Sequence, residues 1–411
     1  MGDGLPRGRF GTIDVEAATE GGGALDFQLT HEQVLIQESI RKTVERDINP
    51  ILKAQDPDKP LTREVTRRIL DICVPLGLTG LRVPEDGGGA GVSALMFGLM
   101  KEQLPAVVSF ICGGQETTAV RLYYGGTPEQ KERYLPAILN GEKLGCTGST
   151  EPNSGSDPRA IRTRAERDGD HMVINGQKVW VSNAAICDFM LVIANAGNDA
   201  KGGSKLIRVI ADKAEAPFVT RKTPTLGFRQ GNLGEAYFDN YRVPMRNVID
   251  TDEDAGAQKI MHETWLTQRP MMGLLAVNMA QQALDSAVEY SRERVMFGRK
   301  IGGFQLVQEL LSEISTAVTT SRLLCYYALD SIDKGLNANQ LSAMAKRYSI
   351  AACQRAISMA MEVHGAMGIS TELGLEQLYR DVRMLPIPDG TNQILTLIEG
   401  REITGISALR G

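Results

Sequence analysis

The hydrophobic period of this 411-residue sequence changes twice, and this feature constrains its fold more than any other. From about residue 28 to residue 140, apolar residues recur at helical spacing. Residues 150–245 instead alternate polar and apolar side chains in short runs, as strands do. From about residue 256 onward the helical period returns in long segments with very little internal glycine or proline. The order of elements is therefore predicted to be helices, then strands, then helices.

Local signals support each part of this order. Val65, Ile69 and Ile72 share one helical face, and residues 127–139 open with Thr-Pro and acidic residues, as helices do. In the strand region, turns are expected at 167–170 and 175–178. The glycine-rich stretch that begins with PEDGGG follows no clear strand, and we interpret it as a connector.

We therefore predict an α+β protein with four parts. A loose tail covers 1–26, an N-terminal all-α domain 27–145, a middle antiparallel β domain 146–255 and a C-terminal four-helix bundle 256–411. The middle domain is expected to contain about seven short strands. The wide apolar faces of the C-terminal helices allow bundles to pack against one another in an oligomer.

Composition and charge exclude several classes of function. The net charge is -5 and no Lys/Arg block occurs, so we expect no nucleic-acid partner. No run of about 18 uncharged apolar residues is present, so we expect no membrane span. The start of the chain has no apolar signal core, and the expected location is the cytoplasm. The six cysteines form no CxxC pair and the four histidines are scattered, so we predict free thiols and no metal site.

Five segments of the chain carry motifs. They are GSTEPNSGSDP at 148–158, INGQKVWVSN at 174–183, SRERVMFGRKIGGFQLVQ at 291–308, a stretch starting with EVHGA at 362, and DGTNQI at 389–394. In this order, over roughly residues 27–408, they resemble the acyl-CoA dehydrogenases. The resemblance implies FAD as cofactor, an acyl-CoA substrate, a homotetramer and an electron-transfer flavoprotein as electron acceptor, with oxygen as an alternative acceptor.

The first two motifs correspond to the flavin-binding segments of that family. Glycine and small hydroxyl residues let backbone N–H groups approach a flavin closely. The resemblance places Ser149, Thr150, Trp180 and Ser182 beside the isoalloxazine ring. It also gives Thr147 and Val181 as cofactor-binding residues. It places Ser156 near both the cofactor and the substrate. Without the neighbouring motifs, Trp180 would be interpreted as a core tryptophan in a hairpin.

The other motifs correspond to the rest of the FAD site. By resemblance, Arg294, Phe304 and Gln305 reach the diphosphate and adenine, often from a neighbouring subunit, while Glu362, Gly365, Thr391 and Gln393 complete the cofactor contacts. Arginine suits this task because it forms bidentate phosphate contacts, although Arg294 alone would be interpreted as a solvated helix charge. The family commonly has glutamine and glycine where this chain has Glu362 and Ala366, which puts the role of Glu362 in doubt.

The catalytic base of the family is usually a glutamate immediately before Gly-Thr in the last motif. Here that position is Asp389, followed by Gly390. The second base position of the family, one residue before a helix arginine, is Gln268 before Arg269, and an amide is no base. Asp389 is therefore the predicted base, with Ser156, Gln268, Arg269 and Gly390 as predicted substrate contacts. Aspartate is one methylene shorter than glutamate, so three hypotheses stay open: a working base, a modified reaction such as decarboxylating oxidation or enoyl-CoA reduction, or a flavin-binding protein without dehydrogenase activity.

The predicted function is FAD-dependent α,β-dehydrogenation of an acyl-CoA thioester. The chain resembles the glutaryl-CoA dehydrogenases through GCTGSTEPNSGSDP, but it lacks their carboxylate-binding arginine, and the aligned position is approximately Ile111. Val107, Val108 and Phe110 nearby favour an apolar, alicyclic or aromatic acyl group. A carboxylate held by an arginine from elsewhere stays open, as does an acyl carrier protein in place of CoA.

Overall fold

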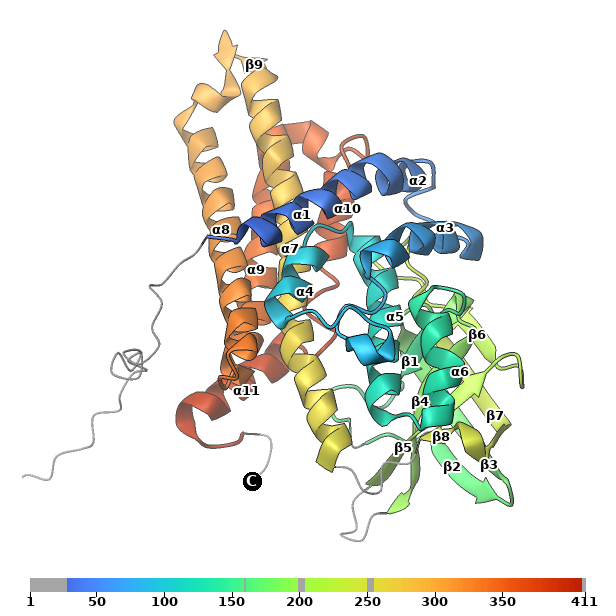
Figure 1. Cartoon of the computed structure of the whole chain (residues 1–411). Coiled ribbons are helices and arrows are strands. Elements are labelled where there is room, and N and C mark those ends of the chain that lie inside the picture. Colours follow the sequence, from blue (N-terminus) through green and yellow to red (C-terminus); the bar gives the residue numbers. More distant parts are fainter. Residues whose placement is uncertain (1–27, 159, 199–203, 250–254, 409–411) are drawn as a thin grey trace, which may run out of the picture.

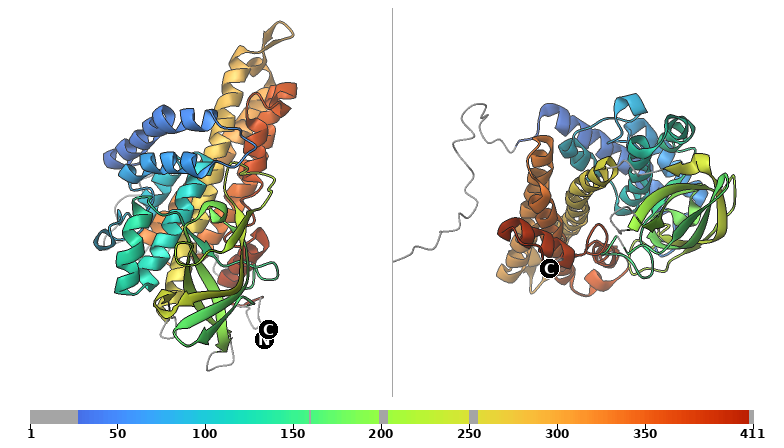
Figure 2. Two further views of the ribbon diagram at one scale, coloured as in Figure 1. Left: turned by 90° about the vertical axis from the view of Figure 1, so that its right-hand side faces the viewer. Right: turned by 90° about the horizontal axis from the view of Figure 1, so that it is seen from below.

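The computed structural model describes residues 28–408 apart from residue 159 and the segments 199–203 and 250–254, so the tail predicted at 1–26 lies outside the described residues. Helices, a β-sheet and a set of long helices follow one another along the chain (Figure 1). The view from below shows the sheet on one side of the molecule and the long helices on the other (Figure 2). The fold is the predicted helical, β and helical series. No helix among the described residues is long and apolar enough to cross a membrane.

The N-terminal helices begin at the residues that cap them. Thr30, Thr62 and Thr127 accept hydrogen bonds from backbone N–H groups in the first turns of their helices, and Thr30 and Thr127 form capping boxes with glutamine. The predicted connector joins α3 to α4 and contains only a short 3-10 turn at Glu85–Gly87. The helices are α1 (His31–Thr43), α2 (Asn49–Lys53), α3 (Arg63–Cys73), α4 (Ala94–Lys101), α5 (Ala106–Gly125) and α6 (Pro128–Leu139).

The middle part is a sheet in the order β6-β7-β3-β2-β4-β5-β8, with β1 also paired to β4. Most neighbours are antiparallel, but β1 and β2 each run parallel to β4. The turn predicted at 167–170 is confirmed, since β2 and β3 form a hairpin with Gly169 at a positive φ of 58°. The strands are β1 (Gly145–Gly148), β2 (Arg164–Asp168), β3 (His171–Val181), β4 (Phe189–Asn198), β5 (Ser204–Asp212), β6 (Val219–Lys222), β7 (Gly234–Pro244) and β8 (Val248–Ile249).

The turn predicted at 175–178 is wrong. These residues lie inside the continuous strand β3, where the pairing with β7 shifts register between Ile174 and Gly176. A Cβ atom on Gly176 would lie 2.4 Å from the Thr163 hydroxyl oxygen, so glycine is required by a close approach inside the sheet. Asn-Gly therefore marks a β-bulge here, and the bulge looks like a hairpin turn in the sequence.

Three long helices dominate the C-terminal part and lie side by side in both views (Figures 1 and 2). They are α7 (Ala255–Glu293), α8 (Gln305–Asp333) and α9 (Asn339–His364), followed by α10 (Leu375–Val382) and α11 (Asn392–Thr404). A short hairpin of β9 (Val295–Met296) and β10 (Arg299–Lys300) joins α7 to α8. Phe297 at its tip is 90% exposed, the highest exposed fraction among the large apolar side chains of the described residues.

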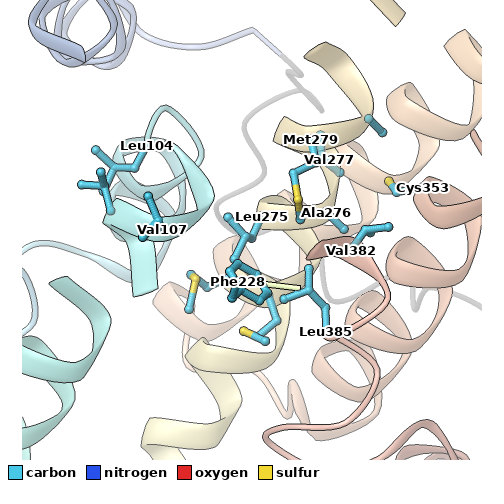
Figure 3. Packing of buried hydrophobic residues seen from close by; sticks show 14 of the residues in the cluster. Leu104, Val107, Phe228, Leu275, Ala276, Val277, Met279, Cys353, Val382 and Leu385 are labelled. Atoms are coloured by element: carbon cyan, nitrogen blue, oxygen red, sulfur yellow. The ribbon is translucent and has the colours of Figure 1, made fainter. Parts of the chain in front are cut away.

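One core is shared by all three parts. Phe228, from a loop of the middle part, is 7% exposed and belongs to the same buried cluster as Leu104, Val107, Leu275 and Leu385. Figure 3 shows Phe228 beside Leu275 of α7 and Leu385 of the segment after α10. This shared core fixes the middle part against the helices. The six cysteines are buried and free, as predicted.

A buried carboxylate at this junction makes stability depend on pH. Asp381 is 6% exposed, and its Oδ1 accepts the backbone N–H of Phe228 at 2.5 Å. Burial raises the pKa of Asp381 from 3.8 to about 6, although the hydrogen bond opposes this shift. Because this pKa is higher in the folded than in the unfolded chain, the stabilising protonation is complete below about pH 4 and is lost as the pH rises through about 6.

Asp381→Asn is therefore expected to be more stable than the wild type by about 1–3 kcal/mol at about pH 8, and nearly equal to it at about pH 3. The amide keeps an acceptor for Phe228 but carries no charge to desolvate. Urea unfolding midpoints of both proteins at the two pH values would measure the difference. A difference of the same size at both pH values would contradict the assignment.

Candidate active site

Asp389 lies in a backbone loop that two cationic side chains hold in place. Its φ is 53° and that of Gly390 is 95°, so two successive residues occupy the left-handed region just before α11. Lys346 Nζ donates to the carbonyl oxygens of Pro388 and Gly390, the latter at 2.5 Å, and Arg269 Nε donates to that of Asp389 at 3.4 Å. Three consecutive carbonyl groups thus accept from side chains of α9 and α7. The position of the candidate base is therefore fixed by the C-terminal helices.

The carboxylate of Asp389 is surrounded by positive charge. Burial lowers the pKa of Lys346 to about 8 and that of Arg121 to about 10, and it lowers that of Arg269 as well. In each case the Asp389 carboxylate acts in the opposite direction, by stabilising the cation. Asp389 itself is half-buried. The site therefore combines one accessible carboxylate with three cations from α5, α7 and α9.

The first flavin segment is fixed by a buried ion pair. Lys178 on β3 is fully buried, and its Nζ donates to Glu151 Oε1 at 2.6 Å and to the carbonyl oxygen of Ser149 at 3.1 Å. Glu151 also accepts the backbone N–H groups of Arg162 at 2.7 Å and Thr163 at 2.9 Å. The turn after β1 that carries Ser149 is therefore bonded to the middle of the sheet, which leaves the small hydroxyl side chains at its surface.

The second flavin segment carries one large ring, the indole of Trp180, on its surface. Trp180 has a φ of 59° and is 56% exposed, while the next residue, Val181, is 2% exposed and belongs to the core of the sheet. The interpretation of Trp180 as a core tryptophan is therefore wrong. Val181 can meet a cofactor only through its backbone. Ser182 is half-buried, and the buried Asn183 again has a positive φ, of 63°.

Helix α5 connects these segments to the base. The hydroxyl groups of Thr118 and Thr147 are 3.1 Å apart, and Thr117 Oγ1 accepts from Gln268 Nε2 at 3.0 Å. The same helix therefore contacts the first flavin segment on one side and the α7 residues next to Arg269 on the other. An outward indole, several hydroxyl groups and a turn with free surface fit a planar isoalloxazine ring. These residues would hold the ring of FAD, which accepts a hydride when bound.

The remaining predicted cofactor residues form a second group at the other end of the long helices (Figure 1). Arg294, Phe304 and Gln305 lie at the β9–β10 tip, and Phe304 contacts Phe297 with ring centroids 6.2 Å apart. Tyr290 of α7 stacks on His364 at the end of α9 with centroids 4.6 Å apart, so Glu362 and Gly365 lie at the same end. Within one chain, these residues are therefore separated from Asp389 and from the two flavin segments.

The other predicted residues, Thr391, Gln393 and Ser156, lie at the start of a helix or in a turn. Thr391 is the N-cap of α11, where its hydroxyl accepts the backbone N–H of Ile394 at 3.3 Å, and Gln393 is exposed in the first turn. Ser156 is exposed in the turn after β1. No sequence pattern selects several residues that hold the site together, namely Thr117, Arg121, Glu151, Lys178 and Lys346. Each is an ordinary polar residue in a helix or strand until its tertiary partner is known.

This geometry agrees with the comparisons. Profiles of the acyl-CoA dehydrogenase N-terminal, middle and C-terminal domains match residues 30–142, 146–241 and 255–404. The probable acyl-CoA dehydrogenase YngJ of Bacillus subtilis is 30% identical over 92% of this chain and 100% of its own length. The cyclohex-1-ene-1-carbonyl-CoA dehydrogenase of Geobacter metallireducens is 34% identical over 91% of this chain and 98% of its own.

A solved structure leads to the same conclusion. Butyryl-CoA dehydrogenase from Megasphaera elsdenii superposes with a TM-score of 0.83 and 27% identity, over 92% of this chain and 100% of that chain. Fold and site together define an FAD-dependent oxidoreductase. The chain belongs to the acyl-CoA dehydrogenase family.

Lys346 provides a test of the loop geometry. Lys346→Met removes both donors to the carbonyl groups that flank Asp389, so the carboxylate is expected to move and the rate of flavin reduction by an acyl-CoA to fall about 100-fold. Stopped-flow absorbance would measure this rate in protein of equal FAD content. Lys334→Met is the matched control, because Lys334 is exposed and pairs only with Asp330. Equal rates in both variants would show that Lys346 does not position the loop.

Proposed function

We propose that this protein catalyses the α,β-dehydrogenation of an acyl-CoA thioester, with Asp389 as the base that removes the α-proton. The observation that carries the proposal is the position of Asp389 in the motif where the family has its base. Its carboxylate is half-buried, and Arg269 and Lys346 hold its loop through backbone carbonyl groups. FAD, when bound, supplies the acceptor for the β-hydrogen. The proposed electron acceptor is an electron-transfer flavoprotein, and the proposed assembly is a homotetramer.

Each residue of the loop has a defined task in this proposal. Asp389 takes the proton at a carboxylate oxygen, and the three cations around it remain to balance the negative charge that moves to the thioester oxygen. Gln268 is an amide bonded to Thr117, so it orients α5 against α7 and takes no proton. Trp180 shields one side of the reaction from water.

The acyl group is proposed to be broad and apolar. Phe110 of α5 stacks on Phe228 with ring centroids 5.9 Å apart, and a Cβ atom on Gly113 one turn later would meet no atom within 4 Å. This helix face therefore has an aromatic end followed by open space. Val107 and Val108, selected from the sequence, are buried in the core that also contains Phe228. The name of the Geobacter metallireducens relative, a cyclohexenecarbonyl-CoA dehydrogenase, supports an alicyclic substrate.

Product analysis tests the proposal. The purified holoprotein would be incubated with an artificial electron acceptor and a panel of acyl-CoAs that includes straight, branched, alicyclic and aromatic members. We expect a 2-enoyl-CoA product with two hydrogens fewer than the substrate. Loss of carbon dioxide would assign the decarboxylating reaction instead. Reduction of enoyl-CoA without any oxidation of acyl-CoA would make the protein a reductase.

A further inference from the structure

We propose, on the basis of the function above, that Arg121 binds a carboxylate carried by the acyl group of the substrate close to the carbon that Asp389 deprotonates. The residue lies on α5, one helical turn beyond Thr117 and two turns beyond Gly113. It would give this site a specificity for acyl-CoAs with a second, negatively charged group. Sequence comparison with the glutaryl-CoA dehydrogenases does not select this position, because their arginine aligns near Ile111.

The position of Arg121 on α5 places it between the flavin segments and the base. In the two helical turns before Arg121, a Cβ atom on Gly114 would lie 2.6 Å from Asn183 Nδ2, and Thr118 contacts Thr147. In the same turns, Thr117 accepts from Gln268 of α7. Residues 114, 117, 118 and 121 share one face of a helix. Arg121 therefore faces the space that both flavin segments and α7 border.

The charge of Arg121 is not paired within the described part of the chain. No hydrogen bond or ion pair joins Arg121 to another described residue, whereas the nearby Arg82 is bonded through Nε and Nη2 to Glu116 and through Nη1 to Thr267. Arg121 is half-buried, and burial of its guanidinium lowers its pKa. A desolvated guanidinium whose donors no described residue uses is suited to hold a carboxylate in a bidentate manner.

The charges around Asp389 indicate where a carboxylate of the substrate would bind. Lys346 and Arg269 already donate to backbone carbonyl groups, and Nη1 of Arg269 is buried without a partner. With Arg121 they make three cations against the single carboxylate of Asp389. A second anion from the substrate compensates this excess. Thr117, one turn before Arg121, is bonded to Gln268, and the next residue, Arg269, donates to the Asp389 carbonyl group. The substrate carboxylate is therefore placed near the reacting carbons, on the β-carbon or next to it, while the apolar part of the acyl group extends toward Gly113 and Phe110.

Matched pairs of thioesters test this specificity. One pair is butyryl-CoA and succinyl-CoA, in which a carboxylate replaces the terminal methyl group. The other is cyclohexane-1-carbonyl-CoA and 2-carboxycyclohexane-1-carbonyl-CoA. Dissociation constants would be measured calorimetrically on the FAD-loaded Asp389→Asn variant, which binds without turnover, and flavin reduction rates on the enzyme with its base. Each measurement would be repeated with Arg121→Met, Arg121→Lys and the control Arg133→Met, whose arginine pairs with Glu215 at the surface of α6.

We expect the carboxylated member of at least one pair to bind and react about 10- to 100-fold better than its neutral partner. Arg121→Met should abolish this ratio, Arg121→Lys should restore part of it, and Arg133→Met should leave it unchanged. Equal affinity for both members in the presence of Arg121, or an equal loss for both members in Arg121→Met, would overturn the inference. A preference for the carboxylated member in binding without any flavin reduction would instead refute the dehydrogenase function and leave the specificity of Arg121 standing.

Discussion

Replacing Asp389 by asparagine is expected to slow flavin reduction by a good acyl-CoA substrate on the order of 10³-fold, without loss of FAD. An amide cannot accept the α-proton. Asparagine nevertheless tolerates the left-handed backbone, here at a φ of 53°, better than most residues, so the loop should keep its shape. The hydrogen bonds from Lys346 and Arg269 go to backbone carbonyl groups and are unaffected by the change.

Stopped-flow absorbance of the oxidised flavin band in wild type, Asp389→Asn and Asp389→Glu would measure this effect. The glutamate variant keeps a carboxylate and lengthens its reach, so it separates loss of the base from loss of position. We expect it to react faster than the asparagine variant. An asparagine variant that reduces its flavin at the wild-type rate would place the base on another residue.

The second large effect is expected at Lys178. Burial lowers the pKa of Lys178, and burial alone would also raise that of Glu151, but hydrogen bonds from Lys178, Thr163 and Arg162 hold the pKa of Glu151 below its ordinary value. Lys178→Met therefore leaves a charged carboxylate in the sheet without its cation, at a cost of about 3–5 kcal/mol. The carbonyl group of Ser149 loses its donor as well, so the flavin segment is expected to loosen and FAD to dissociate.

A double variant separates the two contributions. Adding Glu151→Gln to Lys178→Met removes the uncompensated charge but does not restore the donor to Ser149, so we expect stability to recover in part and FAD affinity to recover less. Urea unfolding and fluorimetric FAD titration would measure the two quantities. A Lys178→Met protein with the unfolding midpoint and FAD affinity of the wild type would show that the pair has no such role.

The sequence predicted the order of parts because hydrophobic period reports directly on the burial pattern of helices and strands. It failed at residues 175–178, where Asn-Gly gives the same signal in a hairpin turn and in a β-bulge. The close approach of Gly176 to Thr163 decides between them, and that contact joins β3 to the residue before β2. An indole in a strand is more often a core residue, yet Trp180 is 56% exposed, and only the neighbouring motifs pointed away from a core position.

The candidate site was predictable where a motif places the functional group in one segment, as with Asp389 and Gly390. It was not predictable where the group acts from a distant helix. Lys346 lies 43 residues before Asp389 in the sequence, and only the packing of α9 against the last loop brings its Nζ to Pro388 and Gly390. Arg121 is one of two charged residues in a mostly apolar helix, and its relation to Asp389 depends on the docking of α5 against α7.

The most direct test of the account is anaerobic flavin reduction by an acyl-CoA deuterated at the α-carbon, compared with the unlabelled thioester. If Asp389 removes the α-proton during dehydrogenation, the oxidised flavin band disappears with both substrates, and deuterium slows its disappearance several-fold. The same flavin in Asp389→Asn should stay oxidised on this time scale. A wild-type protein that holds FAD but is reduced by no acyl-CoA, or one reduced at a rate that neither deuterium nor the asparagine variant changes, would contradict the account.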